Sequence, residues 1–172
     1  MPTLIRNRQL VAVDAWRIVG LHSDEPSAFS ECEDVVVPLA CWKSAAASLA
    51  RRPGRTGVWL APADHPAELA AVGFPALVAV HFPAFTDGRG YSTARLLRER
   101  YGFRGELRAV GDVLRDQLYE LARVGFDAFA LRADQDAQAA LSAFADYSED
   151  CQAAADRGPL FARRFAGGEQ RR

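Results

Sequence analysis

Between Ala76 and Leu131 the chain repeats one pattern, in which an apolar run is followed by a polar turn and an amphipathic helical stretch. The first run is ALVAVHF (76–82), and the turn after it is PAFTDGRGYS (83–92). An almost continuously apolar run is typical of a central strand in a parallel sheet, because helices cover both of its faces. A strand followed each time by a helix indicates βα units.

The same alternation extends over most of the chain. We expect strands at 35–39, 56–62, 76–82, 105–111 and 127–133, with helices at 42–52, 66–72, 91–101, 113–124 and 135–151. The sequence therefore predicts a single α/β domain of repeated βα units, with about five mostly parallel strands in an open twisted sheet. A full (β/α)₈ barrel needs eight units, so a partial TIM-like barrel is the alternative.

The remaining segments are assigned around this domain. Residues 1–33 are predicted to be an N-terminal extension that packs on the α/β domain (34–157), with 10–16 as a short strand or hairpin arm and Trp16 as the packing anchor. Residues 158–172 are predicted to be a mobile basic tail. Asp64 and Asp112 precede helical stretches and are the expected N-caps.

Composition limits the functional classes. The 172 residues are 49% hydrophobic, which suits one domain with a sizeable core, and the net charge of -1 gives no reason to expect nucleic acid as a partner. No apolar run approaches the roughly 18 residues of a membrane span, so we expect a cytoplasmic protein without membrane contact. A homodimer is compatible with a chain of this size.

The residues that most often bind metals are scattered. Cys32, Cys41 and Cys151 form no CxxC pair, and His22 and His65 have no partners at ligand spacing. Neither a disulfide framework nor a zinc or iron–sulfur site is indicated, so we expect no metal. Nothing in the pattern identifies a cofactor.

The polar chemistry concentrates in the turn after the central strand. Glycines there permit a close approach of backbone to a ligand, and the first helical turn offers free N–H groups to an anion. The candidate ligand-binding residues of this turn are Thr86, Asp87, Gly88, Arg89, Gly90, Tyr91 and Ser92. The alternative is a purely structural turn, in which Asp87 bonds its own backbone and the glycines take left-handed positions.

A second charged turn follows the next strand. Asp112 and Arg115 open the next helix, and adjacent parallel strands would place them beside Asp87 and Arg89. His81 ends the central strand, so the candidate catalytic groups are Asp87, Asp112 and His81. The alternatives are an ion-pair lattice that stiffens the loops, a simple helix cap at Asp112 and a structural histidine.

The first turn also contains a shortened dinucleotide-binding fingerprint. Gly88-x-Gly90-x-x-Thr93 lies between a strand and a helix, and Asp112 lies where an acid could bind a ribose. The third glycine is absent and a long loop precedes the first. A flavin or nicotinamide site is thus an alternative to the anion site.

Long motifs of this chain resemble a bacterial family, domain of unknown function 934. They are VVVPLACW (35–42), GVWLAPADHP (57–66), the whole stretch 74–131 and FADYSEDCQ (144–152), and the resemblance spans about residues 4–161. Members commonly carry the label of an oxidoreductase involved in sulfite reduction. The family often has a Lys where this chain has Ala84, so a role of that Lys would be absent here.

The resemblance implies a place in assimilatory sulfite reduction. We expect an accessory or oxidoreductase-type protein that binds an anionic ligand or the sulfite reductase at the loops after the central strands. Arg89 and Arg115 would hold the anion, and Asp87 and Asp112 would orient the arginines or relay protons. The alternatives are a flavin- or nicotinamide-dependent oxidoreductase and a non-enzymatic interaction subunit.

Overall fold

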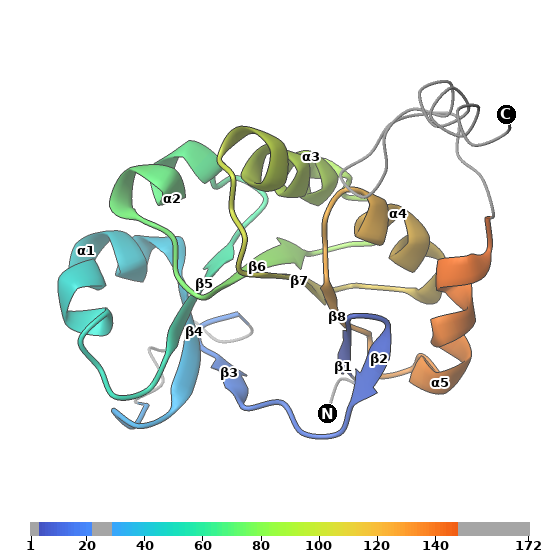
Figure 1. The fold of residues 1–172 in the computed structure, drawn as a ribbon, viewed down its shortest axis with the longest axis horizontal. Coiled ribbons are helices and arrows are strands. Elements are labelled where there is room, and N and C mark those ends of the chain that lie inside the picture. Colours follow the sequence, from blue (N-terminus) through green and yellow to red (C-terminus); the bar gives the residue numbers. More distant parts are fainter. Residues whose placement is uncertain (1–3, 22–28, 148–172) are drawn as a thin grey trace, which may run out of the picture.

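A computed structural model describes residues 4–21 and 29–147, which form one eight-stranded sheet and five α-helices (Figure 1). The strands are β1 (Leu4–Arg6), β2 (Gln9–Val11), β3 (Trp16–Ile18), β4 (Asp34–Pro38), β5 (Thr56–Leu60), β6 (Leu77–Phe82), β7 (Glu106–Gly111) and β8 (Ala128–Ala130). The helices are α1 (Leu39–Leu49), α2 (Pro66–Val72), α3 (Arg89–Arg95), α4 (Leu118–Arg123) and α5 (Ala137–Ala140). The predicted tail (158–172) lies outside the described residues.

The strand order is β2-β1-β8-β7-β6-β5-β4-β3. Strands β3 to β8 are parallel and neighbour one another in chain order, whereas β1 is antiparallel to both β2 and β8. The helices follow one another around the outer side of the curved sheet (Figure 1). This is a half-barrel, so the α/β class and the partial-barrel alternative are confirmed, and the expected five strands are too few.

The three additional strands come from residues 4–18. Each has only three residues, which is too short for a periodic apolar signal to be recognised in a sequence. Trp16 is buried on the inner face, the sheet face opposite the helices, as expected of a packing anchor.

Helix α2 has the predicted bounds but not the predicted cap, and the bounds of the other helices differ from expectation; α1, for example, begins three residues earlier than predicted, at Leu39. Asp64 does not cap α2; it accepts a hydrogen bond from the Ala61 N–H, and His65 Nδ1 accepts from the Ala67 N–H instead. The stretch expected as a helix at 113–124 contains a 3₁₀ turn, η2 (Arg115–Gln117), before α4 begins at Leu118. Helix α3 continues as a π-helical turn, η1 (Leu96–Arg100), and α5 as a 3₁₀ turn, η3 (Leu141–Ala145).

The main hydrophobic core lies between the sheet and its helices. Alternate residues of the central strands contribute to it, such as Val78, Val80 and Phe82 of β6, and all three are buried. The other residues of β6 face inward, where Leu77 and Ala79 join a smaller cluster with Trp16 and Val110.

The curvature of the sheet follows from one short connection. Strands β2 and β3 are the two edges of the sheet, yet only residues 12–15 join them. Seven strand spacings of about 4.8 Å would separate the edges of a flat sheet by about 34 Å. The five residue steps from Val11 to Trp16 reach about 18 Å at most. The sheet must therefore curl, and the connection runs across the opening of the half-barrel (Figure 1).

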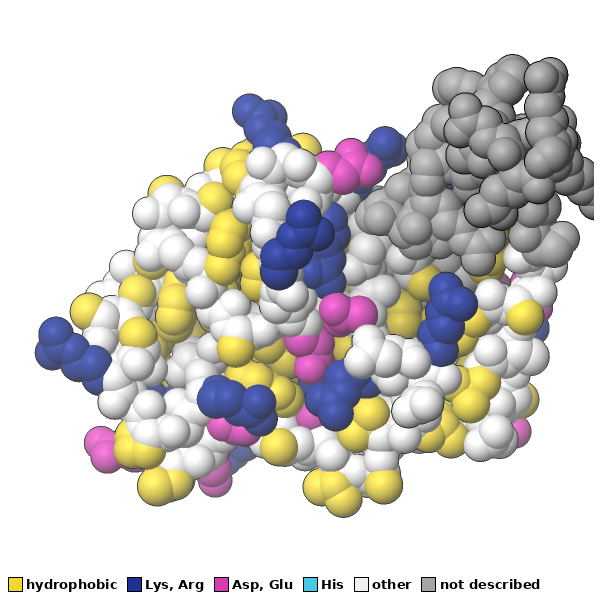
Figure 2. Space-filling model, viewed as in Figure 1, with side chains coloured by type: hydrophobic (Ala, Val, Ile, Leu, Met, Phe, Trp, Pro, Cys, Tyr) yellow, Lys and Arg dark blue, Asp and Glu magenta, His cyan; other side chains and the backbone are white. Residues whose placement is uncertain are grey.

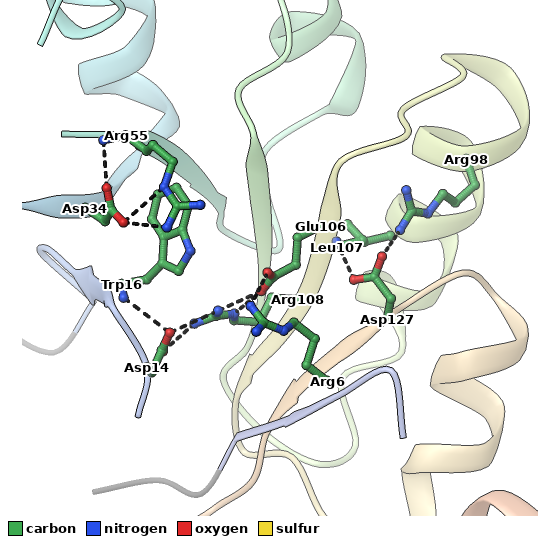
Figure 3. Close-up of polar contacts among 10 residues, drawn as sticks. All are labelled: Arg6, Asp14, Trp16, Asp34, Arg55, Arg98, Glu106, Leu107, Arg108 and Asp127. Carbon is green, nitrogen blue, oxygen red and sulfur yellow. Dashed lines mark hydrogen bonds and ion pairs between the residues drawn. The ribbon is translucent and has the colours of Figure 1, made fainter. Parts of the chain in front are cut away.

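A buried arginine holds this connection to the middle of the sheet. Arg108 of β7 faces inward with only 1% of its surface exposed. Its Nη1 donates to Asp14 Oδ2 at 2.6 Å, and its Nε donates to Glu106 Oε1 at 2.8 Å (Figure 3). Asp14 Oδ1 also accepts from the Trp16 N–H, so one carboxylate joins the connection, β3 and β7.

Replacing Arg108 with Met is expected to lower the free energy of unfolding by about 3 kcal/mol, because the carboxylates of Asp14 and Glu106 lose their buried partner. The expected loss lies at the lower end of the range of free energies measured when buried ion pairs are broken, because the side chains of Asp14 and Glu106 are partly exposed to water. Urea denaturation measures the effect.

Arg17→Met provides the matched control. Arg17 pairs with Glu33 on the surface, with half of its side chain exposed, and its loss should cost less than about 1 kcal/mol. Equal losses in the two variants would contradict the central role of Arg108.

Candidate functional site

The loops after β6 and β7 lie side by side at the carboxyl edge of the sheet. Phe82 and Gly111 end the two strands and are paired in register, and the Asp112 N–H donates to the Phe82 carbonyl at 2.7 Å. The two charged turns that the sequence predicts to be neighbours are therefore adjacent. Loops at this edge are where half-barrel and barrel proteins place their functional groups.

Asp112 links three loops and is not a helix cap. Its Oδ2 accepts from the Phe85 N–H at 2.7 Å, and its Oδ1 accepts from Arg132 Nη1 at 2.7 Å. Phe85 follows β6 and Arg132 follows β8, so a single carboxylate fixes the loops of three adjacent strands. The expectation of an N-cap is wrong because the chain stays non-helical until Arg115.

Asp87 and Arg89 form a closed pair within the first loop. Asp87 Oδ1 accepts from the backbone N–H and the Nε of Arg89, and Oδ2 accepts from Nη2 at 2.6 Å. These hydrogen bonds lower the pKa of Asp87 to about 2. At neutral pH this carboxylate is charged and holds the arginine in place.

Of the two glycines of the loop, only Gly90 is required by packing. Gly88 precedes α3 with a φ of -80°, so it needs no left-handed conformation. Gly90 lies inside α3, where a Cβ atom would come within 2.4 Å of the Phe82 ring. Helix–strand packing therefore explains the second glycine of the shortened dinucleotide fingerprint, and nothing in the structure requires the first.

The other predicted residues of this loop separate into buried and exposed ones. Tyr91 packs edge-on against Phe82, with ring centroids 5.7 Å apart, and burial raises the pKa of Tyr91. Thr86 and Ser92 are exposed, and their hydroxyls make no hydrogen bond to another described residue.

Arg115 is not joined to Arg89 or Asp112. Its guanidinium pairs with Asp146 at 3.0 Å and donates to Ser142, and both partners follow α5. Arg132 takes the position expected for Arg115, since it bonds Asp112 and also Asp134. The predicted strand 127–133 placed Arg132 inside the strand; because β8 ends at Ala130, Arg132 lies in the loop at the carboxyl edge.

His81 is the second-last residue of β6 and lies on the inner face. Its ring lies edge-on to Trp59, with centroids 6.1 Å apart, and it adds to the lowering of the Asp87 pKa. Gly111 has a φ of +101°, and a Cβ atom there would come within 2.8 Å of His81 Cδ2. Any side chain at 111 would displace His81, so the glycine is required.

The carboxyl edge therefore presents paired charges around an exposed aromatic residue. Phe85 is 44% exposed, and the side chains of Arg89 and Arg132 are 63% and 45% exposed. Each arginine already has carboxylate partners. On the face seen in Figure 2, basic and acidic side chains are likewise interspersed.

Residues 4–21 and 29–147 contain neither a metal-ligand cluster nor a membrane-spanning helix. No three His, Cys, Asp or Glu side chains there are grouped as metal ligands. No helix of this part is long and apolar enough to cross a membrane. Cys32 and Cys41 are free and exposed, and Cys151 lies outside the described residues.

Comparison with known families gives one match. Residues 57–161 match the model of a family described as "Bacterial protein of unknown function (DUF934)". The chain belongs to this family. Searches of the curated proteins and of the solved structures find no match. The DUF934 region begins in β5. It includes the residues that form ion pairs at the carboxyl edge, which we call the carboxyl-edge pairs: Asp87, Arg89, Asp112, Arg132 and Asp134.

The Asp87–Arg89 pair can be tested by titration. The Arg89→Gln variant should raise the pKa of Asp87 from about 2 toward its ordinary value of 3.8, because the charge-assisted hydrogen bonds are lost. Carbon-13 NMR of the side-chain carboxyl measures this. Since the pKa is lowered in the folded state, the stabilisation by Asp87 is present above about pH 4 and is lost as the pH falls toward 2.

Arg95→Gln is the control, because Arg95 lies on the same helix but pairs with Glu99. An Asp87 pKa that stays near 2 in the Arg89→Gln variant would show that another group holds the charge.

Proposed function

We propose that this DUF934 protein is a non-enzymatic accessory protein of assimilatory sulfite reduction, and that it docks on the sulfite reductase through its carboxyl edge. The link to sulfite reduction comes from the label that members of the family commonly carry. The docking surface comes from the geometry of Phe85, Arg89 and Arg132.

One observation favours a protein partner over a small anion at this edge. Among the described residues beside Phe85, Arg89 and Arg132 have exposed guanidiniums, and Asp87, Asp112 and Asp134 neutralise both. A small anion would have to displace a carboxylate from each. A protein surface can instead bury Phe85 and match the mixed charges around it, and aromatic and arginine side chains supply most of the binding energy in such interfaces.

The loops are also stiff enough to act as a preformed surface. Gln117 Oε1 accepts from the Leu114 N–H while its Nε2 contacts the Phe85 carbonyl at 3.4 Å, and Asp112 holds the Phe85 N–H. Both backbone groups of Phe85 are thus bonded to the neighbouring loop. An aromatic side chain on a fixed backbone loses little conformational freedom when it binds.

The first test is genetic. A strain without the gene should fail to grow on sulfate or sulfite as the sole sulfur source and should grow on sulfide or cysteine, because only the step between sulfite and sulfide is impaired. Normal growth on all four sources would refute the assignment to sulfite reduction.

Complementation then tests the surface. Plasmid-borne Phe85→Ala, Arg89→Gln or Asp87→Asn should restore growth on sulfite poorly, whereas Arg95→Gln, outside the carboxyl-edge pairs, should restore it fully. Urea denaturation of each purified variant excludes unfolding as the cause.

Direct binding gives a further prediction. Phe85→Ala should weaken binding to the sulfite reductase of the same bacterium by about tenfold or more, which is the effect of truncating a central aromatic residue. Surface plasmon resonance measures the dissociation constant. Wild-type protein that does not bind the reductase would refute the proposed partner while leaving the genetic result intact.

A further inference from the structure

A groove at the opposite, amino edge of the sheet is formed by two adjoining cavities. The larger, of about 400 Å³, is lined by residues that include Arg98, Arg104 and Asp127, and the smaller, of about 190 Å³, includes Arg8. The two cavities share Ala122, Phe126 and Asp127 as lining residues. We call this feature the amino-edge groove. Its larger part is within the size range of small-molecule sites.

Most charges along the groove are paired internally. Arg98 donates to the carbonyls of Phe103, Gly105 and Gly125, and its Nη2 donates to Asp127 Oδ2 at 2.9 Å (Figure 3). Asp127 Oδ1 accepts from the Leu107 N–H. The hydrogen-bonding groups of Arg98 and Asp127 are therefore all engaged within the protein. The pair stabilises the residues that line the groove and adds no net charge to it.

Glu99 is the other acid of the larger cavity, and it is neutralised as well. Both of its carboxylate oxygens lie 3.0 Å from Arg95 Nε. Among the described residues that line the groove, two charged side chains remain without a partner of opposite charge, and both are arginines.

Arg104 and Arg8 are those two arginines, and each lines a different cavity. Within the described part of the chain, neither makes an ion pair or a side-chain hydrogen bond. The guanidinium of Arg8 lies 5.6 Å from the centre of the Phe144 ring, a contact that leaves its N–H donors free. The groove therefore has, in each of its two parts, an exposed arginine without a carboxylate partner among the described residues.

The backbone at Arg8 adds a second observation. Asn7 and Arg8 are the two central residues of the β1–β2 turn, with φ of 51° and 61°. Such a turn favours glycine at its second position, because only glycine adopts this conformation without strain. An arginine in a strained position that lines a cavity points to a role for its side chain.

We propose that the amino-edge groove binds an elongated small molecule with an oxyanion group at each end, one held by Arg104 and the other by Arg8. Arginine binds carboxylates and phosphates with two parallel hydrogen bonds. The apolar surface of Phe126 and Ala122, shared by both cavities, contacts the middle of the ligand.

Unbranched dicarboxylates of increasing length, from succinate to sebacate, test the proposal by isothermal titration calorimetry. The affinity should reach a maximum at one chain length, where the ligand spans the two guanidiniums. At that length the dicarboxylate should bind about tenfold more tightly than the monocarboxylate, because a second charge-assisted hydrogen-bonded contact forms. Alkane bisphosphonates of the same lengths, titrated in parallel, identify the preferred oxyanion.

Two variants locate the site. Arg104→Gln and Arg8→Gly should each lower the affinity for the best ligand about tenfold, whereas Arg51→Gln, which removes an exposed arginine after α1, should leave it unchanged. Arg8→Gly should at the same time raise the urea midpoint, because glycine relieves the strain of the turn. This opposite effect on binding and stability excludes a loss of folding as the cause.

The absence of saturable binding at millimolar dicarboxylate and bisphosphonate would overturn the proposal. So would an affinity that is unchanged in both the Arg104→Gln and the Arg8→Gly variant. Neither result bears on the carboxyl-edge surface, which uses other residues.

Discussion

The connection of residues 12–15 is the constraint on which the rest of the structure depends. It joins the two edges of an eight-stranded sheet with too little chain to span a flat one. The sheet is therefore curved, and the five helices that the structure describes lie on its outer side. The connection runs across the inner face. Arg108 and Asp14 supply the contact between the two.

That arrangement explains why a charged side chain is buried on the inner face. The connection reads Ala12-Val13-Asp14-Ala15, and its apolar residues are exposed, Val13 by 82%, so hydrophobic packing does not hold it in place. A charged hydrogen bond is directional and fixes the connection at one point of β7. Trp16, Leu77 and Val110 form an apolar cluster on the same face of the sheet.

The sequence predicted the parts of the fold that depend on local patterns. The apolar runs identified β4 to β8, and the turn residues placed Asp87 and Asp112 on neighbouring loops. What it could not reveal depends on pairing between distant residues. Strand β1 is defined by its pairing with β8, which is distant in the sequence, and β2 is defined by its pairing with β1. Asp112 likewise bonds the distant Arg132 and does not cap the helix that follows it. A carboxylate before a helical stretch has the same local signature whether it caps the helix or bridges two loops.

The two edges of the sheet differ in how their charges are satisfied, and this difference separates their roles. At the carboxyl edge Asp112 and Asp87 neutralise the arginines beside them, so the exposed feature is Phe85 and the surface suits a partner protein. At the amino edge the carboxylates are engaged by Arg98 and Arg95, which leaves Arg104 and Arg8 without a carboxylate partner in the part of the chain that the structure describes. Free guanidiniums in a groove favour a small anion, because the ligand need not displace an existing ion pair. One sheet can thus present a surface for a protein at one edge and a site for a small molecule at the other, with the fixed strands between them.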